Sequence, residues 1–178
     1  MTVQPDHPYP QPRREATEAE ARALASAVRL RILRLTLDQA LTNKEIAERL
    51  GRNPASVLHH VRRLVDTGFL AAGPVRRGRR GSREVPYRAT GKSWTVNVSS
   101  QDARSTSERA MFAAFVEEIG SLDPGETIST RLGLRLTAEE AAELRGRIQA
   151  VLDEFMRRPQ SEQGEPLGVF CMMYPDRR

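Results

Sequence analysis

The sequence predicts an α+β fold that is mainly helical. Apolar residues recur at helical spacing before residue 67, a hairpin pattern with a basic turn covers residues 69–90, and helical and alternating segments follow after residue 110. The 178 residues suffice for one compact domain or two small ones. We expect a disordered tail at residues 1–15, a first domain at 16–98 and a C-terminal region at 99–178.

The first helical segment covers residues 17–37. Leu24, Val28 and Leu35 recur there at the spacing of one helix face. The segment is predicted either as one long helix or as two helices with a break near Ser26.

The next two helices are marked by their ends. Thr42 and Glu45 have the spacing of a capping box, in which each side chain accepts a hydrogen bond from the backbone of the other. Gly51 can end this helix, because a left-handed residue is least costly as glycine. Asn53 is a good N-cap and Pro54 fits the first position of the following helix.

The second of these helices, residues 54–67, has two faces. Its apolar stripe, at i, i+4, i+7 and i+8, consists of Val57, Val61, Leu64 and Val65. The opposite side carries Ala55, Ser56, His59, Arg62 and Arg63. His59 and His60 point about 100° apart and cannot bind one metal ion together, since a helical metal pair needs i, i+3 or i, i+4 spacing.

A hairpin with a basic tip follows. Two strand candidates, residues 69–75 and 85–90, flank a run that carries Arg76, Arg77, Arg79, Arg80 and Arg83. Residues 1–100 hold 18 basic and 9 acidic residues, whereas residues 101–178 hold 10 and 14. Biased genome composition could explain the excess of 26 Arg over 2 Lys. The clustering at a hairpin tip instead favours contact of the basic half with a polyanion.

The C-terminal region reads as helix, strand, helix, strand. Residues 99–107 are polar and predicted as a linker, and residues 111–119 form an amphipathic helix. Residues 128–136 alternate and predict a strand. A capping box at Thr137 starts a second helix, and residues 167–174 predict a closing strand. We expect this region to dimerise or to sense an effector.

These elements follow one another in the order of a winged helix-turn-helix. The helix at residues 54–67 can enter the major groove, where base edges present a distinct pattern of donors and acceptors. The arginine-rich wing, residues 76–83, would lie on the minor groove or the backbone, since a narrow minor groove attracts arginine. If all five wing arginines met phosphates, log K would fall by about 4.5 per unit of log salt.

Four blocks in this order, LASAVRLRILRL, LTNKEIAERLG, NPASVLHHVRRLVDTGFL and PYRATGKSW, resemble the ArsR-type winged-helix regulators of bacteria. The resemblance covers residues 16–94. It implies a homodimeric DNA-binding regulator of transcription, usually a repressor that an effector releases. The block LRLTAEEAAELRGRIQAVLDEF resembles the region appended in a subgroup that lacks cysteine metal sensing.

The chain departs from the family pattern in two places. The family often has Asp-Pro where this chain has Ala27 and Val28, and no cysteine precedes Cys171, so thiolate sensing of the family type is disfavoured. Cys171, Met172 and Met173 are soft metal donors. Strand alternation would place Met172 on the other face, and packing is the preferred interpretation.

The residues expected to touch DNA combine the face assignment with the resemblance. The family pattern places Ser56, Leu58 and His59 at base-reading positions, and Arg62 and Arg63 would reach phosphates one turn later. The complete expected set is Thr42, Asn53, Ala55, Ser56, Leu58, His59, Arg62, Arg63, Arg76, Arg77, Arg79, Arg80 and Arg83.

Enzyme chemistry finds little support in the sequence. The three histidines are His7, His59 and His60, and no GxSxG, phosphate-binding GxxxxGK[ST] or HExxH motif is present. We therefore expect no catalytic residue, no cofactor and no metal. No signal peptide or membrane-length apolar run is evident, and a cytoplasmic location is expected.

The expected function is sequence-specific binding of double-stranded DNA by a homodimeric repressor of transcription, and a small-molecule effector is left open. The alternative is a protein-interaction module that uses the winged helix as a scaffold. RNA binding is weaker as a hypothesis, because the basic half lacks exposed aromatic residues for base stacking.

Overall fold

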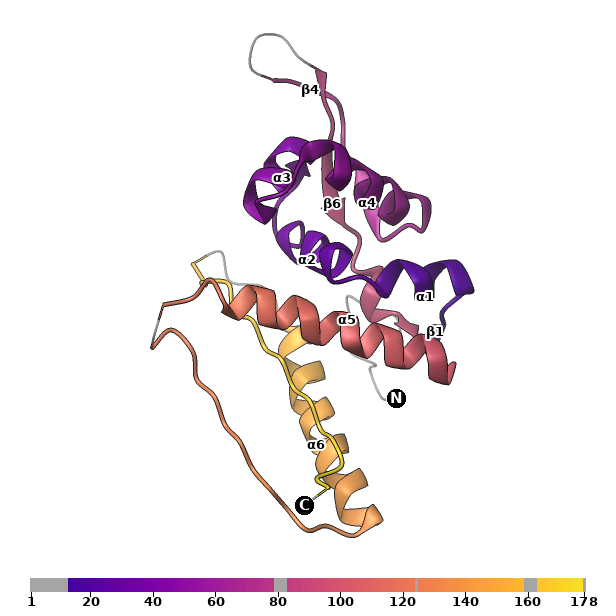
Figure 1. Ribbon diagram of the computed structural model, residues 1–178, viewed down its shortest axis with the longest axis vertical. Helices are drawn as coiled ribbons and strands as arrows, with labels where there is room; N and C mark the ends of the chain where they lie inside the picture. The colour runs from indigo at the N-terminus through magenta and orange to yellow at the C-terminus, as the bar shows by residue number, and fades with distance from the viewer. Residues whose placement is uncertain (1–12, 79–82, 124, 159–162, 178) are drawn as a thin grey trace, which may run out of the picture. The chain divides into compact units, whose positions relative to one another are not determined.

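The computed structural model describes residues 13–78, 83–123, 125–158 and 163–177. Its fold is α+β and mainly helical, and the first half contains a helix-turn-helix and a wing, as expected (Figure 1). The chain divides into two compact units, of which the first ends at Ser121 and the second begins at Leu122. The expected boundary between residues 98 and 99 therefore lies inside the first unit.

Four helices form the first part of the first unit. They are α1 (Glu18–Leu24), α2 (Ala27–Leu35), α3 (Asn43–Leu50) and α4 (Pro54–Asp66). Of the two alternatives for residues 17–37, the one with two helices is confirmed. Ser26 is extended, with φ −153° and ψ 120°, and separates α1 from α2.

The core of the first unit lies between α2, α3, α4 and a small sheet. Its largest fully buried apolar side chains are Ile32, Ile46, Val57, Val61, Leu64 and Phe69. Three of them belong to the stripe expected on α4, and Val65 is half-buried beside them. Because burial of each large apolar side chain contributes about 1.5–3 kcal/mol, this stripe determines which face of α4 points outward.

The hairpin expected over residues 69–90 is present. β2 (Leu41–Thr42), β6 (Pro86–Ala89) and β3 (Leu70–Ala72) form an antiparallel sheet in the order β2-β6-β3. Beyond this sheet, β4 (Arg76–Arg77) pairs with β5 (Arg83–Glu84). The sequence does not predict β2, since two residues are too few to show an alternating pattern.

The hairpin bends between its two strand pairs. Ala72 lies opposite Tyr87 and Arg76 lies opposite Glu84, so three residues on one strand face two on the other. An extra residue of this kind is a β-bulge, which bends the strand and increases its twist. The inner sheet alone therefore does not determine the direction of β4 and β5.

The first described residues are tied to the end of the winged-helix region. β1 (Arg14–Glu15) pairs in parallel with β7 (Val96–Asn97), which follows the short 3-10 helix η2 (Lys92–Trp94). Arg14 and Glu15 belong to the expected disordered tail, and for these two residues the prediction is wrong. Their partner strand is distant in sequence, so local composition does not reveal it. Residues 1–12 of that tail lie outside the described residues.

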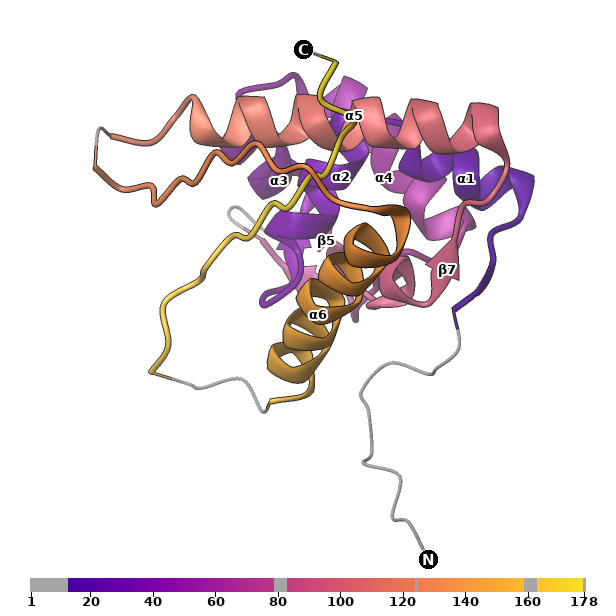
Figure 2. The same ribbon diagram turned by 90° about the horizontal axis from the view of Figure 1, so that it is seen from below.

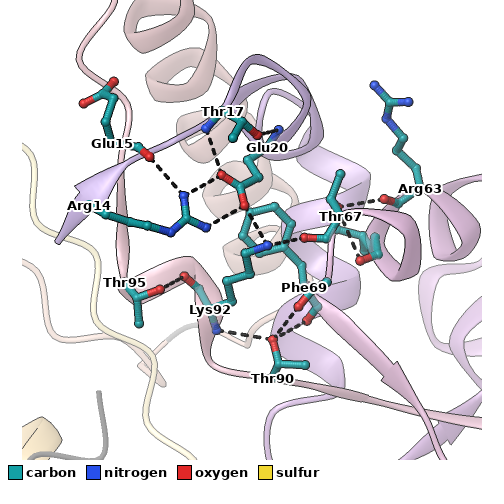
Figure 3. A network of polar contacts seen from close by, with 12 residues as sticks. Arg14, Glu15, Thr17, Glu20, Arg63, Thr67, Phe69, Thr90, Lys92 and Thr95 are labelled. Carbon is teal, nitrogen blue, oxygen red and sulfur yellow. Dashed lines mark hydrogen bonds and ion pairs between the residues drawn. The ribbon is translucent and has the colours of Figure 1, made fainter. Parts of the chain in front are cut away.

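A buried carboxylate holds this N-terminal strand in place (Figure 3). Glu20 is 5 % exposed, and its oxygens accept hydrogen bonds from Arg14 at 2.6 and 2.8 Å and from the Thr17 backbone N–H at 2.8 Å. Lys92 Nζ lies 2.6 Å from the same carboxylate. The Arg14 hydrogen bonds, with those of Lys92 and Thr17, hold the pKa of Glu20 far below its usual range against the opposing effect of burial.

Lys92 extends this network to the end of α4. Its ammonium group donates to the Thr67 carbonyl at 2.5 Å and lies 5.2 Å from the centre of the Phe69 ring (Figure 3). Gly68, with φ 72°, provides the left-handed residue between them. Lys92 therefore both pairs with Glu20 and donates a hydrogen bond to the C-terminal end of α4.

A long helix, α5 (Gln101–Ile119), completes the first unit and packs against α1 and α2 (Figure 2). The linker predicted at residues 99–107 is therefore wrong for residues 101–107, which form its first turns. Ser100 caps the helix, and the small residues Ser107, Ala110 and Ala114 are buried. Polar residues at the helix start have no apolar period, so the sequence alone indicates a linker.

The second unit contains one helix among its described residues, α6 (Ala138–Arg157). The capping box of Thr137 and Glu140 is confirmed. The strands expected at residues 128–136 and 167–174 are not observed: these described segments have no strand pairing. An alternating pattern specifies a side-chain face but no backbone partner, and Ile128 is fully exposed.

Candidate nucleic-acid interface

The start of α4 is shaped by the turn that precedes it. Gly51 is left-handed, with φ 62°, as expected. The Arg52 N–H then donates to the Ala47 carbonyl at 2.9 Å, and Asn53 Oδ1 accepts from the Ala55 N–H at 2.8 Å. These bonds satisfy the backbone at both helix ends and leave the first turn of α4 directed outward.

The outward face of α4 is the one expected from the sequence. The exposed residues of the predicted set at this helix are Asn53, Ala55, Ser56, His59 and Arg62, and the half-buried ones are Leu58 and Arg63. The helix N-terminus, with its positive dipole end, lies at the same place. This face is therefore polar, accessible and electropositive.

Thr42 is placed differently from the other predicted contact residues. It is 4 % exposed, its hydroxyl accepts from the Glu45 N–H at 3.2 Å, and its own N–H donates to Glu45 at 2.7 Å. A side chain that is buried and already hydrogen-bonded is not available for DNA. We therefore correct the expectation for Thr42, whose role is to cap α3.

His60 lies at the contact between α4 and α2. Arg29 Nη1 is 3.5 Å from His60 Nδ1, and the same guanidinium donates to the carbonyls of Arg22 and Ala23, each at 2.6 Å. Burial lowers the pKa of His60, and nearby positive charges, first that of Arg29, lower it further. Since arginine can only donate, Nδ1 is the acceptor and the ring is neutral in this arrangement.

The strand pair β4–β5 carries the described part of the wing and extends from the end of the first unit opposite α5 (Figure 1). Arg77 lies directly opposite Arg83, and both are exposed. Arg76 is also exposed but lies between Glu45 and Glu84. Arg79 and Arg80 lie outside the described residues.

Two exposed arginines of the winged-helix region are absent from the expected set. Arg52 lies in the turn directly before the N-cap of α4, and Arg88 lies on β6. The alternation of VPYRAT could have identified Arg88, because its neighbours Tyr87 and Ala89 are half-buried. For Arg52, the only indication in the sequence is its position next to the N-cap residue Asn53.

Acidic residues of α5 reach the helix-turn-helix. Glu117 lies 2.5 Å from Arg31 of α2 and 3.9 Å from Arg52 in the turn. Glu118 lies 3.6 Å from Arg34 of α2. These pairs dock α5 on the helix-turn-helix through charges as well as through its buried small residues.

The second unit has an open pocket of about 240 Å³, lined by Leu134, Leu136, Glu140, Glu143, Leu144 and Arg147. Glu143 and Arg147 are paired with each other at 2.5 Å. Pockets for drug-sized ligands have about 300–1,000 Å³, so this pocket by itself does not identify an effector.

Within the described ranges, no His, Cys, Asp or Glu side chains gather in groups of three or more that could hold a metal ion. Across those same ranges, no helix combines the length and the apolar character needed to cross a membrane. Cys171 is exposed.

Comparison with known protein families identifies a helix-turn-helix region in this chain. Residues 24–71, which contain α2, α3 and α4, match the model of a family described as a helix-turn-helix domain. A comparison with curated protein sequences found no match.

Solved structures also show similarity to this chain. Reduced HlyU from Vibrio cholerae is 20% identical, over 58% of this chain and 87% of that one, with a TM-score of 0.33. The transcriptional regulator BldR from Sulfolobus solfataricus is 16% identical, over 70% and 73%, with a TM-score of 0.34. The adhesin competence repressor AdcR from Streptococcus pyogenes is 16% identical, over 72% and 79%, with a TM-score of 0.33. At these TM-scores the superpositions add no functional argument.

Proposed function

We propose that this chain, whose helix-turn-helix lies within residues 24–71, is a sequence-specific regulator of transcription that binds double-stranded DNA. The recognition helix, residues 54–67, would lie in the major groove, and the wing, residues 76–83, on the minor groove or the backbone. The proposed form is a homodimeric repressor in the bacterial cytoplasm. The observation that carries the proposal is the pair of opposed arginines on the wing.

The two arginines repel each other, and a bound polyanion would relieve this repulsion. Arg77 and Arg83 face each other across β4 and β5, and like charges directly opposite each other destabilise a strand pair. Neither makes an ion pair with any described residue. A phosphate beside both guanidinium groups would convert this repulsion into charge-assisted hydrogen bonds.

The face of α4 offers groups suited to base edges. Ser56 can both donate and accept, the Ala55 methyl group can contact a thymine methyl, and His59 is exposed one turn further along. Arg62 is exposed and makes no ion pair with a residue in the described ranges. It therefore suits a phosphate beside the groove.

The proposed homodimer is supported by the outer face of α5. This helix buries small residues against α1 and α2, whereas Met111, Val116 and Ile119 remain more than a third exposed. Apolar residues grouped on one helix face are typical of an interface between proteins. A twofold dimer would place two recognition helices about 34 Å apart and select a near-palindromic site.

In vitro selection from random double-stranded DNA tests the proposal. We expect enrichment of a near-palindromic sequence. Replacing Ser56, His59 and Arg62 by alanine should then weaken binding to that sequence more than binding to unrelated DNA. Replacing Arg77 and Arg83 by glutamine should reduce the steepness of log K against log salt by about 1.8 per subunit, which is about 3.6 for the proposed homodimer. Unchanged affinity in both variants would refute the proposed surface.

A second candidate function is a protein-interaction module that uses the winged helix as a scaffold. It is supported by the exposed apolar side chains of the second unit, such as Leu132, Leu167 and Tyr174. This function predicts a stable complex with another protein and no salt-dependent binding of DNA. A pull-down at several salt concentrations separates the two candidates.

A further inference from the structure

We propose that Glu45 and Arg76 form a latch that sets the direction of the wing, so that Arg76 is a positioning residue and not a phosphate ligand. The inference rests on the proposed function in DNA binding. It gives Arg76 a role different from that of its neighbour Arg77, although the two are adjacent exposed arginines on the same strand.

The latch joins α3 to β4. Arg76 Nη2 donates to Glu45 Oε1 at 2.8 Å and to Oε2 at 2.9 Å. Arg76 Nε also lies 3.8 Å from Oε2 of Glu84, which is the residue opposite it on β5. One guanidinium group therefore lies between two carboxylates, and its charge is compensated before any DNA arrives.

Glu45 is itself held rigidly. Its Oε2 accepts from the Thr42 N–H at 2.7 Å, as part of the capping box of α3. Thr42 in turn belongs to β2, which pairs with β6. The Thr42 backbone hydrogen bond lowers the pKa of Glu45, with Arg76 contributing further, so the carboxylate is charged at neutral pH.

A contact at this position is needed because of the β-bulge. The bulge lies between the pairs Ala72–Tyr87 and Arg76–Glu84, and bulges bend and twist a strand. Arg76 is the first residue of the outer strand pair beyond it. A contact from α3 to that residue fixes the outer pair, and with it Arg77 and Arg83, relative to the helix-turn-helix.

Positioning and phosphate binding differ in their salt dependence. A lost phosphate contact lowers the slope of log K against log salt by about 0.9. A lost positioning contact lowers affinity without removing a bound phosphate. Because exposed ion pairs are weak, the expected loss is about two- to fivefold in affinity.

The test compares Glu45→Gln, Arg76→Gln, the double variant and Arg77→Gln as the matched control. Glutamine at position 45 retains the capping box. Two measurements are made: affinity for the selected DNA over a salt series, and hydrogen exchange of the β4 and β5 amides in the free protein. We expect the first three variants to lose a similar two- to fivefold at unchanged slope and to exchange faster. Arg77→Gln should lower the steepness of log K against log salt by about 0.9 per subunit, about 1.8 for the proposed homodimer, and leave exchange unchanged.

Other outcomes overturn the latch. If Arg76→Gln lowers the steepness of log K against log salt by about 0.9 per subunit while Glu45→Gln strengthens binding, Arg76 is a phosphate ligand that Glu45 restrains. If exchange is the same in all variants, the contact positions nothing. Failure of the wild-type chain to bind any selected DNA would refute the proposed function instead, and the exchange measurement would still decide whether the latch exists.

Discussion

At the residue scale, the arginines of the first unit fall into two groups with different roles. Some hold the fold together through carboxylates or carbonyls, namely Arg14, Arg29, Arg31 and Arg76. Others face outward and make no ion pair with a described residue, for example Arg62, Arg77 and Arg83. Net charge does not separate these groups, so the surface proposed to bind DNA is smaller than the count of basic residues suggests.

The buried carboxylate of Glu20 should control acid stability. Its pKa in the folded chain is far below the ordinary value of 4.5, so the stability it contributes is present above about pH 4.5 and is lost as the pH falls. Glu20→Gln should lower the free energy of unfolding at pH 7 by about 2–3 kcal/mol, below the usual cost of breaking a buried pair because Arg14 is partly exposed. Chemical denaturation between pH 3 and pH 7 measures this, with the exposed Glu18→Gln as control. Equal losses in both variants would contradict it.

His60 should make stability depend on pH in a higher range. Its pKa in the folded chain is lowered from 6.5, so the unfolded chain binds the proton first, and stability falls as the pH drops below about 6.5. His60→Gln should show a smaller loss between pH 7.5 and pH 5.5 than the wild type. Thermal unfolding at these two pH values measures the difference. If the wild type loses no more stability than His60→Gln between these two pH values, the folded chain does not bind the His60 proton more weakly than the unfolded chain does.

At the element scale, helix ends position the outward face of α4. The capping box of α3, left-handed Gly51 and the N-cap Asn53 act within a few residues of one another. Each satisfies backbone groups that would otherwise lack partners. Together they set the angle between α3 and α4, and the buried stripe of α4 then determines its rotation.

Substituting alanine for two glycines should change stability in opposite directions, because one glycine is left-handed and the other lies inside a helix. Gly51→Ala should destabilise the first unit by about 1 kcal/mol, because alanine disfavours φ 62°. An added Cβ there meets no atom within 4 Å, so only the backbone conformation is at issue. Gly146→Ala, inside α6 and equally free of contacts, should stabilise this helix by up to about 1 kcal/mol. Circular dichroism during thermal unfolding measures both, and shifts of the same sign would contradict this account.

At the scale of the whole molecule, the two units differ in how much they bury. Every buried residue in the described ranges lies before residue 121, and the last is Ala114. The described part of the second unit exposes most of its large apolar side chains. The hydrophobic contribution to stability is therefore concentrated in the unit that carries the winged helix.

A fragment of residues 1–121 should consequently fold by itself. The single tryptophan, Trp94, lies inside it and reports on its structure. We expect the fragment and the complete chain to show the same Trp94 emission maximum, with unfolding midpoints within a few degrees. A fragment with the emission of an unfolded chain would show that residues after 121 are required for the core.

The sequence alone determined the features that arise from neighbouring residues. Helix caps at Thr42, Asn53 and Thr137, the turn at Gly51 and the buried stripe of α4 all depend on residues within one or two turns. Local hydrogen bonds and side-chain periodicity produce these features. For this reason most of the fold of the first unit, and the exposed face of α4, could be predicted.

The tertiary structure alone decided which of the predicted groups remain available. Arg76 is neutralised by a carboxylate 31 positions earlier in the chain, and Thr42 is buried where β2 pairs with the distant strand β6. The helical start of α5 depends on packing against α1 and α2, which lie far earlier in the chain. The segments predicted as strands in the second unit have no strand partner among the described residues. Such contacts join residues far apart in sequence, and no local pattern of spacing or charge encodes them.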